Sequence, residues 1–175
     1  MSRARVIAAR PEHFAAMREV ERAAEEIFPL DVLPQALRGA SLTSDDEFEA
    51  ARRDGLLWCA LDARDRVIGY AIALWLGDRS LHLDEIDVHP AEQRRGVGRA
   101  LIQSVRAHAE ANGAPRLTLT TFRGVAWNMP WYERIGFVEL TPSELAGELS
   151  EIFEAEVTRG LARERRVAMA LDLAR

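Results

Sequence analysis

The sequence predicts an α/β fold organised as a single domain over residues 1–175. Runs rich in β-branched and aromatic residues, typical of strands, alternate along the chain with segments whose apolar residues recur every three or four positions, as in amphipathic helices. The chain has 175 residues, of which 48% are hydrophobic, so it is long enough to bury a complete core. No internal repeat, low-complexity tract or linker interrupts the sequence.

The first expected elements are a short strand at residues 5–9 and a helix that opens at Pro11. One face of this helix carries an apolar stripe made of Phe14, Met17, Val20, Ala24 and Ile27. The prolines of "FPLDVLP", residues 28–34, break the helical pattern. Ser44 and the three acidic residues that follow it then predict a capped second helix over about residues 45–53.

Two apolar runs, "LLWCAL" and "VIGYAIALWL", are joined by the polar segment "DARDR" and predict a β-hairpin. A third strand is expected over residues 81–88. Its apolar residues change phase, because Leu81 and Leu83 occupy odd positions whereas the next apolar residues occupy even ones. One extra residue near Asp84 or Glu85 would explain this shift, so we expect a β-bulge there.

The second half of the chain opens with a long helix that begins near Val97 and ends before Gly113. Asn128 is expected to cap a short helix that Gly136 closes in a left-handed conformation. A further amphipathic helix is expected over residues 145–161. The remaining strands are expected at residues 116–120, 137–140 and 167–173.

Charge and cysteine content exclude several classes of protein. The formal net charge is −5 and the isoelectric point is near 5.5, so we expect no nucleic-acid partner. The single cysteine, Cys59, excludes an intrachain disulfide and a thiolate metal cluster, and its apolar flanks indicate a buried structural thiol. We see no signal-peptide pattern and no apolar run of membrane-spanning length, and therefore expect a cytoplasmic protein that does not enter membranes.

The turn between the third strand and the long helix has the features of an anion site. Helix N-termini present unpaired backbone N–H groups and the positive end of the helix dipole. Gly96 and Gly98 let a ligand approach those amides closely, and charge-assisted contacts can come from Arg94, Arg95 and Arg99. The third glycine of a Rossmann fingerprint and the G-K-[ST] of a Walker loop are both absent, so the pattern indicates a phosphate or pyrophosphate bound in another way.

A second polar segment, "WNMPWYERIGF", follows downstream. Asn128 and Tyr132 are four residues apart and therefore share one face of the expected short helix. Trp127 and Trp131 lie on the neighbouring face, where we expect them to pack rather than to contact substrate.

These two segments together resemble one known family. "VHPAEQRRGVGRALI" is similar to the Q/R-x-x-G-x-G/A cofactor motif of the GNAT superfamily of acyl-CoA-dependent N-acyltransferases, and "WNMPWYERIGF" is similar to the N-x-x-x-Y-x-x-x-G-F segment that follows it. The resemblance implies a mixed, mostly antiparallel sheet of about six to seven strands with helices on both faces. It also implies a β-bulge in the strand before the pyrophosphate loop, which splays two neighbouring strands.

The resemblance further implies acetyl-CoA as the acyl donor. The backbone of Ile86, Asp87 and Val88 would contact the pantetheine arm, and Asn128 would hydrogen-bond to it. The pyrophosphate would be held by Gln93, Arg94, Arg95, Gly96, Val97, Gly98 and Arg99. Tyr132 would act as the general acid beside the thioester sulfur, which suits a phenol of pKa about 10 that is protonated at pH 7.

The acceptor amine must lose a proton before it attacks, at a cost of roughly 4–5 kcal/mol at pH 7 for a lysine-like amine of pKa ~10.4. Three acidic residues, Asp84, Glu85 and Asp87, crowd the expected bulge, where repulsion and partial burial can raise the pKa of one of them. Asp84 and Glu85 are therefore candidate bases, and His82, on the same strand face as Asp84, is another. The same residues can instead form a solvated acidic edge that attracts cations.

The expected reaction is transfer of an acetyl group to a primary amine of a small molecule by direct attack in a ternary complex, without a metal. No Ser-His-Asp arrangement is visible and Cys59 lies in an apolar run, which argues against an acyl-enzyme. The resemblance places the acceptor between the first helices and the sheet, near residues 28–34. Two alternatives remain open: acetylation of a protein N-terminus or lysine, and a non-catalytic acyl-CoA-binding module. We expect a monomer or a homodimer.

Overall fold

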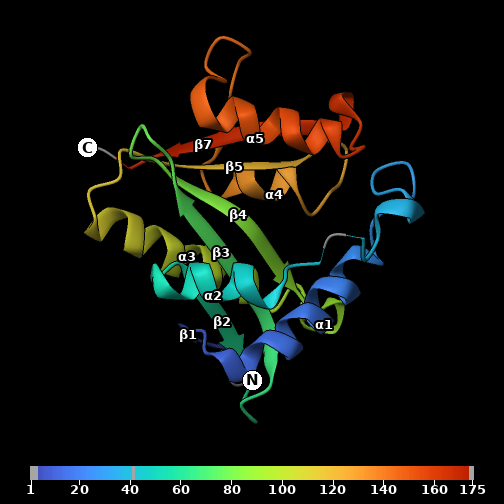
Figure 1. Ribbon diagram of the computed structural model, residues 1–175, viewed down its shortest axis with the longest axis vertical. Coiled ribbons are helices and arrows are strands. Elements are labelled where there is room, and N and C mark those ends of the chain that lie inside the picture. Colours follow the sequence, from blue (N-terminus) through green and yellow to red (C-terminus); the bar gives the residue numbers. More distant parts are fainter. Residues whose placement is uncertain (1–3, 41, 174–175) are drawn as a thin grey trace. The chain divides into compact units, whose positions relative to one another are not determined.

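The computed structural model describes residues 4–40 and 42–173 of the chain (Figure 1). Seven strands pair in the order β1-β2-β3-β4-β5-β7-β6, and the predicted mixed α/β fold is confirmed. The strands are β1 Arg5–Ala8, β2 Leu57–Leu61, β3 Val67–Trp75, β4 Leu81–Val88, β5 Arg116–Phe122, β6 Val138–Glu139 and β7 Arg166–Asp172. The α-helices are α1 Phe14–Glu25, α2 Asp45–Arg53, α3 Val97–Ala111, α4 Met129–Arg134 and α5 Gly147–Thr158.

The chain divides into two compact units that share β4. The first contains the residues up to Leu74 together with Asp84–His108, and the second contains Trp75–Leu83 and the residues from Ala109 onward. The pairing of β4 with β5 is parallel, whereas β1 with β2, β2 with β3, β5 with β7 and β6 with β7 are antiparallel. The organisation of the chain as one domain stays a prediction.

In the first unit, α1 and α2 cover one face of the hairpin formed by β2 and β3. Ser44 begins α2 with a capping box, in which its Oγ accepts a hydrogen bond from the Glu47 N–H at 3.3 Å and the Glu47 carboxylate accepts one from the Ser44 N–H at 2.7 Å. The predicted bounds of this helix are confirmed. Its Phe48 packs between the helices and the sheet in a core made of Ala9, Phe14, Met17, Val20, Phe48, Leu57, Cys59, Leu61, Tyr70 and Ile72.

The other face of the same hairpin is covered by α3. Neighbouring strand residues point to opposite faces, so Trp58 and Gly69 face away from the core that holds Cys59 and Tyr70. The Trp58 ring lies edge-on to the His108 ring of α3, with centroids 5.5 Å apart. All five residues of β2 are buried, because helices cover both faces of the hairpin.

Gly69 sets how closely α3 approaches the sheet. A Cβ at this position would lie 2.8 Å from the backbone oxygen of Asp87, 3.2 Å from Val97 and 3.3 Å from Leu101. Only glycine leaves room for β4 and α3 at this distance, so Gly69 positions the first turns of α3. Sequence analysis missed this role, because an isolated glycine in an apolar strand does not show what it contacts.

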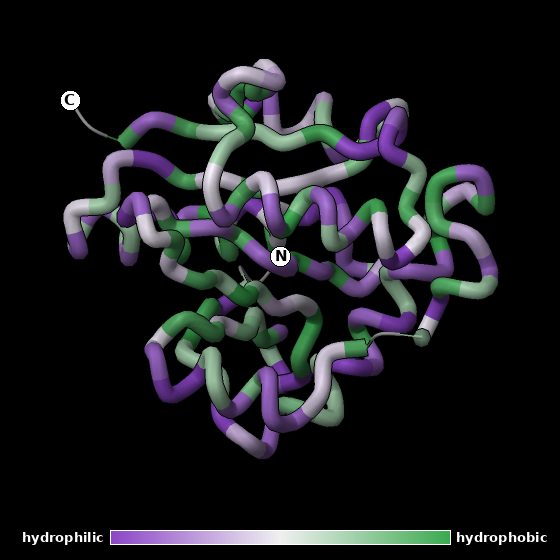
Figure 2. Tube along the Cα trace, turned by 45° about the horizontal axis from the view of Figure 1, so that its top comes forward, coloured by the Kyte–Doolittle hydropathy of each residue, from purple (hydrophilic) through white to green (hydrophobic). Residues whose placement is uncertain are grey.

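In the second unit, a buried ion pair joins α5 to β7. Arg166 Nη2 lies 2.7 Å from Glu156 Oε1, and Thr120 Oγ1 of β5 donates a hydrogen bond to the same carboxylate at 2.6 Å. Figure 2 shows hydrophobic and hydrophilic residues interspersed along the Cα trace. None of the helices in the described ranges is long and apolar enough to span a membrane.

Several expected boundaries differ from the structure. The last helix begins at Gly147, whose φ is +59°, and ends at Thr158, so it is shorter than residues 145–161. Asn128 precedes α4, but the expected side-chain cap is wrong, because Asn128 Nδ2 instead donates to Thr121 Oγ1 at 3.0 Å. Gly136 has the expected positive φ, at +103°.

The irregularity that the structure records in the first unit lies between β2 and β3. Leu61 pairs with Val67 and Ala60 pairs with Gly69, which leaves Ile68 as an extra residue in β3. The backbone oxygen of Ile68 instead accepts a hydrogen bond from the His89 N–H at 3.0 Å, just after β4. The β-bulge expected within β4 stays a prediction.

Candidate active site

The turn from β4 into α3 is held in a defined shape. Gln93 Nε2 donates a hydrogen bond to the backbone oxygen of Val88 at 3.3 Å, which ties the loop to the end of β4. Arg94 and Gly96 both have positive φ, +59° and +85°. Such left-handed residues turn successive backbone N–H groups toward one concave side, the arrangement that binds anions in proteins. The space around the missing Cβ of Gly96 is open, so a ligand can approach its backbone.

The N-terminus of α3 adds further hydrogen-bond donors. The helix begins at Val97, and the N–H of Ala100 donates to the backbone oxygen of Gly96 at 3.0 Å. The backbone amides of Val97, Gly98 and Arg99 lie in the first turn of α3. Amides in a first turn have no carbonyl partner within the helix. They point out of the helix end, where the helix dipole is positive. This turn is therefore fit to hold a phosphate or pyrophosphate.

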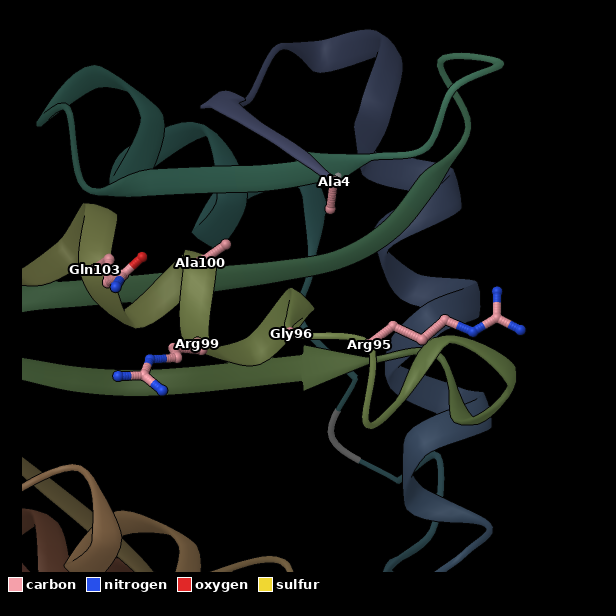
Figure 3. Close-up of a pocket in the computed structure, with 6 residues that line it drawn as sticks. All are labelled: Ala4, Arg95, Gly96, Arg99, Ala100 and Gln103. Carbon is pink, nitrogen blue, oxygen red and sulfur yellow. The ribbon is translucent and has the colours of Figure 1, made fainter. Parts of the chain in front are cut away.

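A pocket of about 360 Å³ opens beside this helix end (Figure 3). It is lined by Ala4, Arg95, Gly96, Arg99, Ala100 and Gln103. Arg95 forms an exposed ion pair with Glu92 at 3.0 Å. In Figure 3 the Arg95 side chain extends away from the loop in one direction, and the Arg99 side chain extends in the opposite direction from the start of α3. Of the predicted pyrophosphate residues, Arg95, Gly96 and Arg99 line this pocket.

The acidic residues at the end of β4 lie in the same unit. Asp84 is exposed, and Glu85 and Asp87 are half-buried. Asp87 Oδ2 lies 3.5 Å from the hydroxyl of Tyr70, which is fully buried in β3. Burial, together with the charges of Glu21 and Glu25, raises the pKa of Asp87 well above its ordinary value, and the hydrogen bond from Tyr70 offsets this only in part.

Glu21 of α1 completes a buried polar cluster that sequence analysis missed. Its carboxylate, only 5% exposed, accepts hydrogen bonds from the backbone N–H of Thr43 at 3.1 Å and from the Thr43 hydroxyl at 3.2 Å. Burial raises the pKa of Glu21, although hydrogen bonds from Thr43 and Tyr70 lower it in part. A signal was present in the sequence, because Glu21 lies four residues after Met17 and three before Ala24, on the apolar stripe.

Tyr132 and Asn128 lie in the second unit, on and just before α4. Tyr132 is 7% exposed, and its ring packs against those of Trp131 and Phe137 with centroid distances of 4.9 and 5.6 Å. The backbone oxygen of Asn128 accepts a hydrogen bond from the Tyr132 N–H at 3.1 Å, so one helical turn connects the two residues. Trp127, at 43% exposed, is less buried than a packing role predicts.

His82, also in the second unit, has the surroundings of a structural histidine. It is 1% exposed, and its Nδ1 lies 3.0 Å from the hydroxyl of Thr118. Burial, with a smaller contribution from the charge of Arg166, lowers the pKa of His82 to about 4. The imidazole is therefore neutral at pH 7 and a weak proton acceptor, which disfavours it as the base.

Cys59 has the environment that its sequence predicted. It is buried in β2, and its Sγ lies 3.4 Å from Nδ1 of His13. Burial raises the pKa of the Cys59 thiol to about 11, so the thiol stays protonated and unreactive near neutral pH.

The fold and this turn define an α/β protein with a helix end that is fit to hold a phosphate-bearing ligand. A family model described as the acetyltransferase (GNAT) family matches residues 16–137, which is more than half of the chain. The chain belongs to the GNAT acetyltransferase family. It is accordingly an N-acyltransferase that uses an acyl-CoA donor.

Solved structures support the same fold at low sequence identity. The PaiA N-acetyltransferase of Thermoplasma acidophilum, in complex with coenzyme A, is 14% identical with a TM-score of 0.71 and matches 98% of this chain and 99% of its own. The ribosomal-protein alanine N-acetyltransferase of Escherichia coli is 21% identical with a TM-score of 0.67, over 98% and 95% of the two chains. The N-acetylglutamate synthase of Neisseria gonorrhoeae is 15% identical with a TM-score of 0.73, over 100% and 36%. Two of these proteins are named for different products or acceptors, a ribosomal-protein alanine and N-acetylglutamate, so the comparison leaves the acceptor of this chain open.

Proposed function

We propose that the protein transfers an acetyl group from acetyl-CoA to a primary amine of a small molecule, by direct attack in a ternary complex in the cytoplasm. The observation that carries the proposal is the turn before α3, where the positive φ angles of Arg94 and Gly96 and the first amides of the helix form an anion site beside arginines. A metal is not needed for this reaction, because hydrogen-bond donors and a general acid suffice to stabilise and release a thiolate.

The donor is bound along the end of β4 and the following loop. The backbone of Ile86, Asp87 and Val88 contacts the pantetheine arm, and the loop from Gln93 to Arg99 holds the pyrophosphate. Asn128 contributes a further hydrogen bond to the arm. One proton of its amide is engaged by Thr121, and the amide group has a second proton and an acceptor oxygen for this purpose.

Tyr132 is the general acid. Its phenol donates a proton to the sulfur of coenzyme A as the carbon–sulfur bond breaks, so the leaving group departs as a neutral thiol. Packing between Trp131 and Phe137 fixes the ring, which reduces the entropy lost in reaching the reactive geometry.

Glu85 is the general base for the acceptor. The amine nitrogen forms its bond to the thioester carbonyl carbon, and Glu85 accepts the proton that the nitrogen loses, directly or through water. Of the two candidate carboxylates, Glu85 is partly shielded from water whereas Asp84 is exposed. The Glu85 charge is also close enough to the buried cluster to raise the pKa of Tyr70.

The acidic surroundings favour an amine that arrives as a cation. The charges of Glu85 on β4 and Glu25 at the end of α1 act on the buried cluster of Glu21, Tyr70 and Asp87. Negative potential concentrates cationic ligands near a site and raises their rate of association. The acceptor is thus expected to be a small cationic amine.

A thiol-release screen tests the proposal. The protein is mixed with acetyl-CoA and a panel of small amines, amino acids, aminoglycosides and short peptides, and free coenzyme A is measured. Release with small amines supports the proposal, release only with peptides favours a protein acetyltransferase, and tight coenzyme binding without release across the panel favours a binding module. Rapid formation of an acyl-enzyme with acetyl-CoA alone would refute direct attack.

Two variants then test the assigned roles on any substrate found. Tyr132→Phe should lower kcat by about 10²–10⁴-fold, the usual contribution of a general acid, with coenzyme affinity retained. Glu85→Gln should lower the rate most at neutral pH and less at high pH, where the free amine is abundant. Glu151→Gln, which removes an exposed carboxylate from α5, is the matched control and should leave both rates unchanged. Full activity of Tyr132→Phe would show that the acid is another group.

A further inference from the structure

We propose that Thr121 of β5 is a positioning residue for donor binding, whose hydroxyl holds the Asn128 side chain in place for the pantetheine arm. This inference rests on the role of Asn128 in the proposed function, and it adds a residue that lies outside both sequence motifs. Thr121 is 3% exposed, so it acts through Asn128 and not by contact with the donor. Both residues belong to the second unit, at the end of β5 and just before α4.

The backbone of Asn128 is held from both sides. Its N–H donates a hydrogen bond to the backbone oxygen of Val125 at 3.0 Å. Its backbone oxygen accepts hydrogen bonds from the N–H groups of Trp131 at 2.8 Å and Tyr132 at 3.1 Å. These bonds fix the main chain but leave the side chain free to rotate. The hydrogen bond from Asn128 Nδ2 to Thr121 Oγ1, at 3.0 Å, therefore fixes the orientation of the amide.

An amide that is already fixed binds a ligand at a lower entropic cost. A freely rotating side chain loses its rotational freedom when it binds, whereas a side chain held in the bound orientation has lost that freedom on folding. Asn128 is half-buried, so part of the residue remains accessible to a ligand. The Thr121 hydroxyl can thus raise the affinity for the donor without touching it.

The neighbouring threonines of β5 provide an internal comparison. Side chains alternate between the two faces of a strand, so Thr118 and Thr120 share one face and Thr121 lies on the other. Thr118 Oγ1 lies 3.0 Å from Nδ1 of His82, and Thr120 Oγ1 donates to Glu156 at 2.6 Å. These two hydroxyls bond to buried partners, whereas the Thr121 hydroxyl holds a side chain that is still partly accessible.

Titration calorimetry with coenzyme A tests the inference without an acceptor. Thr121→Val keeps the shape of the side chain and removes the hydroxyl, and it should weaken coenzyme A binding by about three- to tenfold, as expected for one hydrogen bond. Thr121→Ser keeps the hydroxyl and should bind with wild-type affinity. If Thr121→Val does not fold, Thr121→Ala removes the same hydroxyl and takes its place.

A double-mutant cycle separates positioning from a structural role. Asn128→Ala should weaken coenzyme A binding at least as much as Thr121→Val does, and adding Thr121→Val to Asn128→Ala should cause no further loss. A general disturbance of β5 would instead lower the affinity in both backgrounds. The matched control is Thr118→Val, which removes a buried hydroxyl from the opposite face of the same strand. It should preserve the affinity for coenzyme A even if its Tm falls.

The outcomes distinguish this inference from the proposed function. Wild-type affinity in Thr121→Val, together with weakened binding in Asn128→Ala, overturns the inference and leaves the proposed function intact. An equal loss from Thr121→Val in both backgrounds also overturns it, because Thr121 then acts by another route. If Asn128→Ala binds coenzyme A as the wild type does, the proposed contact of Asn128 with the arm is wrong and the inference fails with it. Absence of binding by the wild type refutes the proposed donor.

Discussion

Replacement of Gly69 by alanine tests the closest approach between β3, β4 and α3. The added Cβ would lie 2.8 Å from the backbone oxygen of Asp87, a distance that real Cβ atoms essentially never show, and within 3.3 Å of Val97 and Leu101. Backbone cannot move aside as a flexible side chain can. Overpacking of this kind costs about 1–3 kcal/mol, so the Gly69→Ala variant should be less stable by about that amount.

The matched control is Gly77→Ala, in the turn before β4. There a Cβ would meet only the flexible carboxylate of Glu148, at 3.4 Å. Both substitutions reduce the conformational freedom of the unfolded chain, which stabilises each variant by about 0.4–1 kcal/mol. The difference in stability between the two variants therefore reports the clash at residue 69. The Gly77→Ala variant should be as stable as the wild type or slightly more so.

Thermal unfolding followed by circular dichroism measures both variants. For a chain of this length, 1 kcal/mol shifts Tm by roughly 2–4 °C, so Gly69→Ala should melt several degrees below Gly77→Ala. The coenzyme affinity of the Gly69→Ala variant should also fall, because a displacement of α3 moves the backbone amides of the turn between β4 and α3. Equal Tm values for the two variants would refute the close packing that we describe.

Three further predictions concern single interactions. The free energy of unfolding of the wild type should fall as the pH is lowered from about 6.5 to about 4, because His82 binds a proton in the unfolded state but, with a folded-state pKa of about 4, not in the folded state. Thermal melting measured at several pH values should show this slope. The His82→Asn variant should show a flatter one. Glu156→Ala should cost about 3–5 kcal/mol in urea unfolding, because it leaves the buried charge of Arg166 unpaired, whereas Glu151→Ala on the exposed face of α5 should change little. Ser44→Ala should cost about 1 kcal/mol by the same measurement, and no loss would contradict the observed capping box.

Much of the fold could be predicted because its signals are local. In the described part of the chain, the seven strands and five α-helices follow from residue periodicity, and the bounds of α2 follow from Ser44 and the acidic first turn. Apolar spacing alone predicts too long a last helix, because it does not register the left-handed backbone at Gly147. The local preference of asparagine for helix N-termini predicts a capping bond from Asn128, whereas its side chain bonds to Thr121 on β5.

The candidate site was predictable only where it is built from one continuous segment. The residues from Gln93 to Arg99 are contiguous, and the glycine spacing reports on their backbone conformation directly. The buried cluster of Glu21, Tyr70 and Asp87 joins α1, β3 and β4, and nothing in the sequence pairs these residues with one another. The same holds for His82, whose burial beside Thr118 makes it a poor base.

By itself, the sequence determined the α/β class, the order of the elements and the glycine-containing turn before α3, because periodicity, capping and glycine conformation are properties of neighbouring residues. Tertiary structure alone decided which polar groups are buried and what they contact. Burial and charge proximity set the pKa values of Asp87 and His82, and they depend on residues that are distant in the chain. Contacts between residues distant in the chain also explain Gly69 of β3, which leaves room for the close approach of Asp87 on β4 and of Val97 and Leu101 on α3.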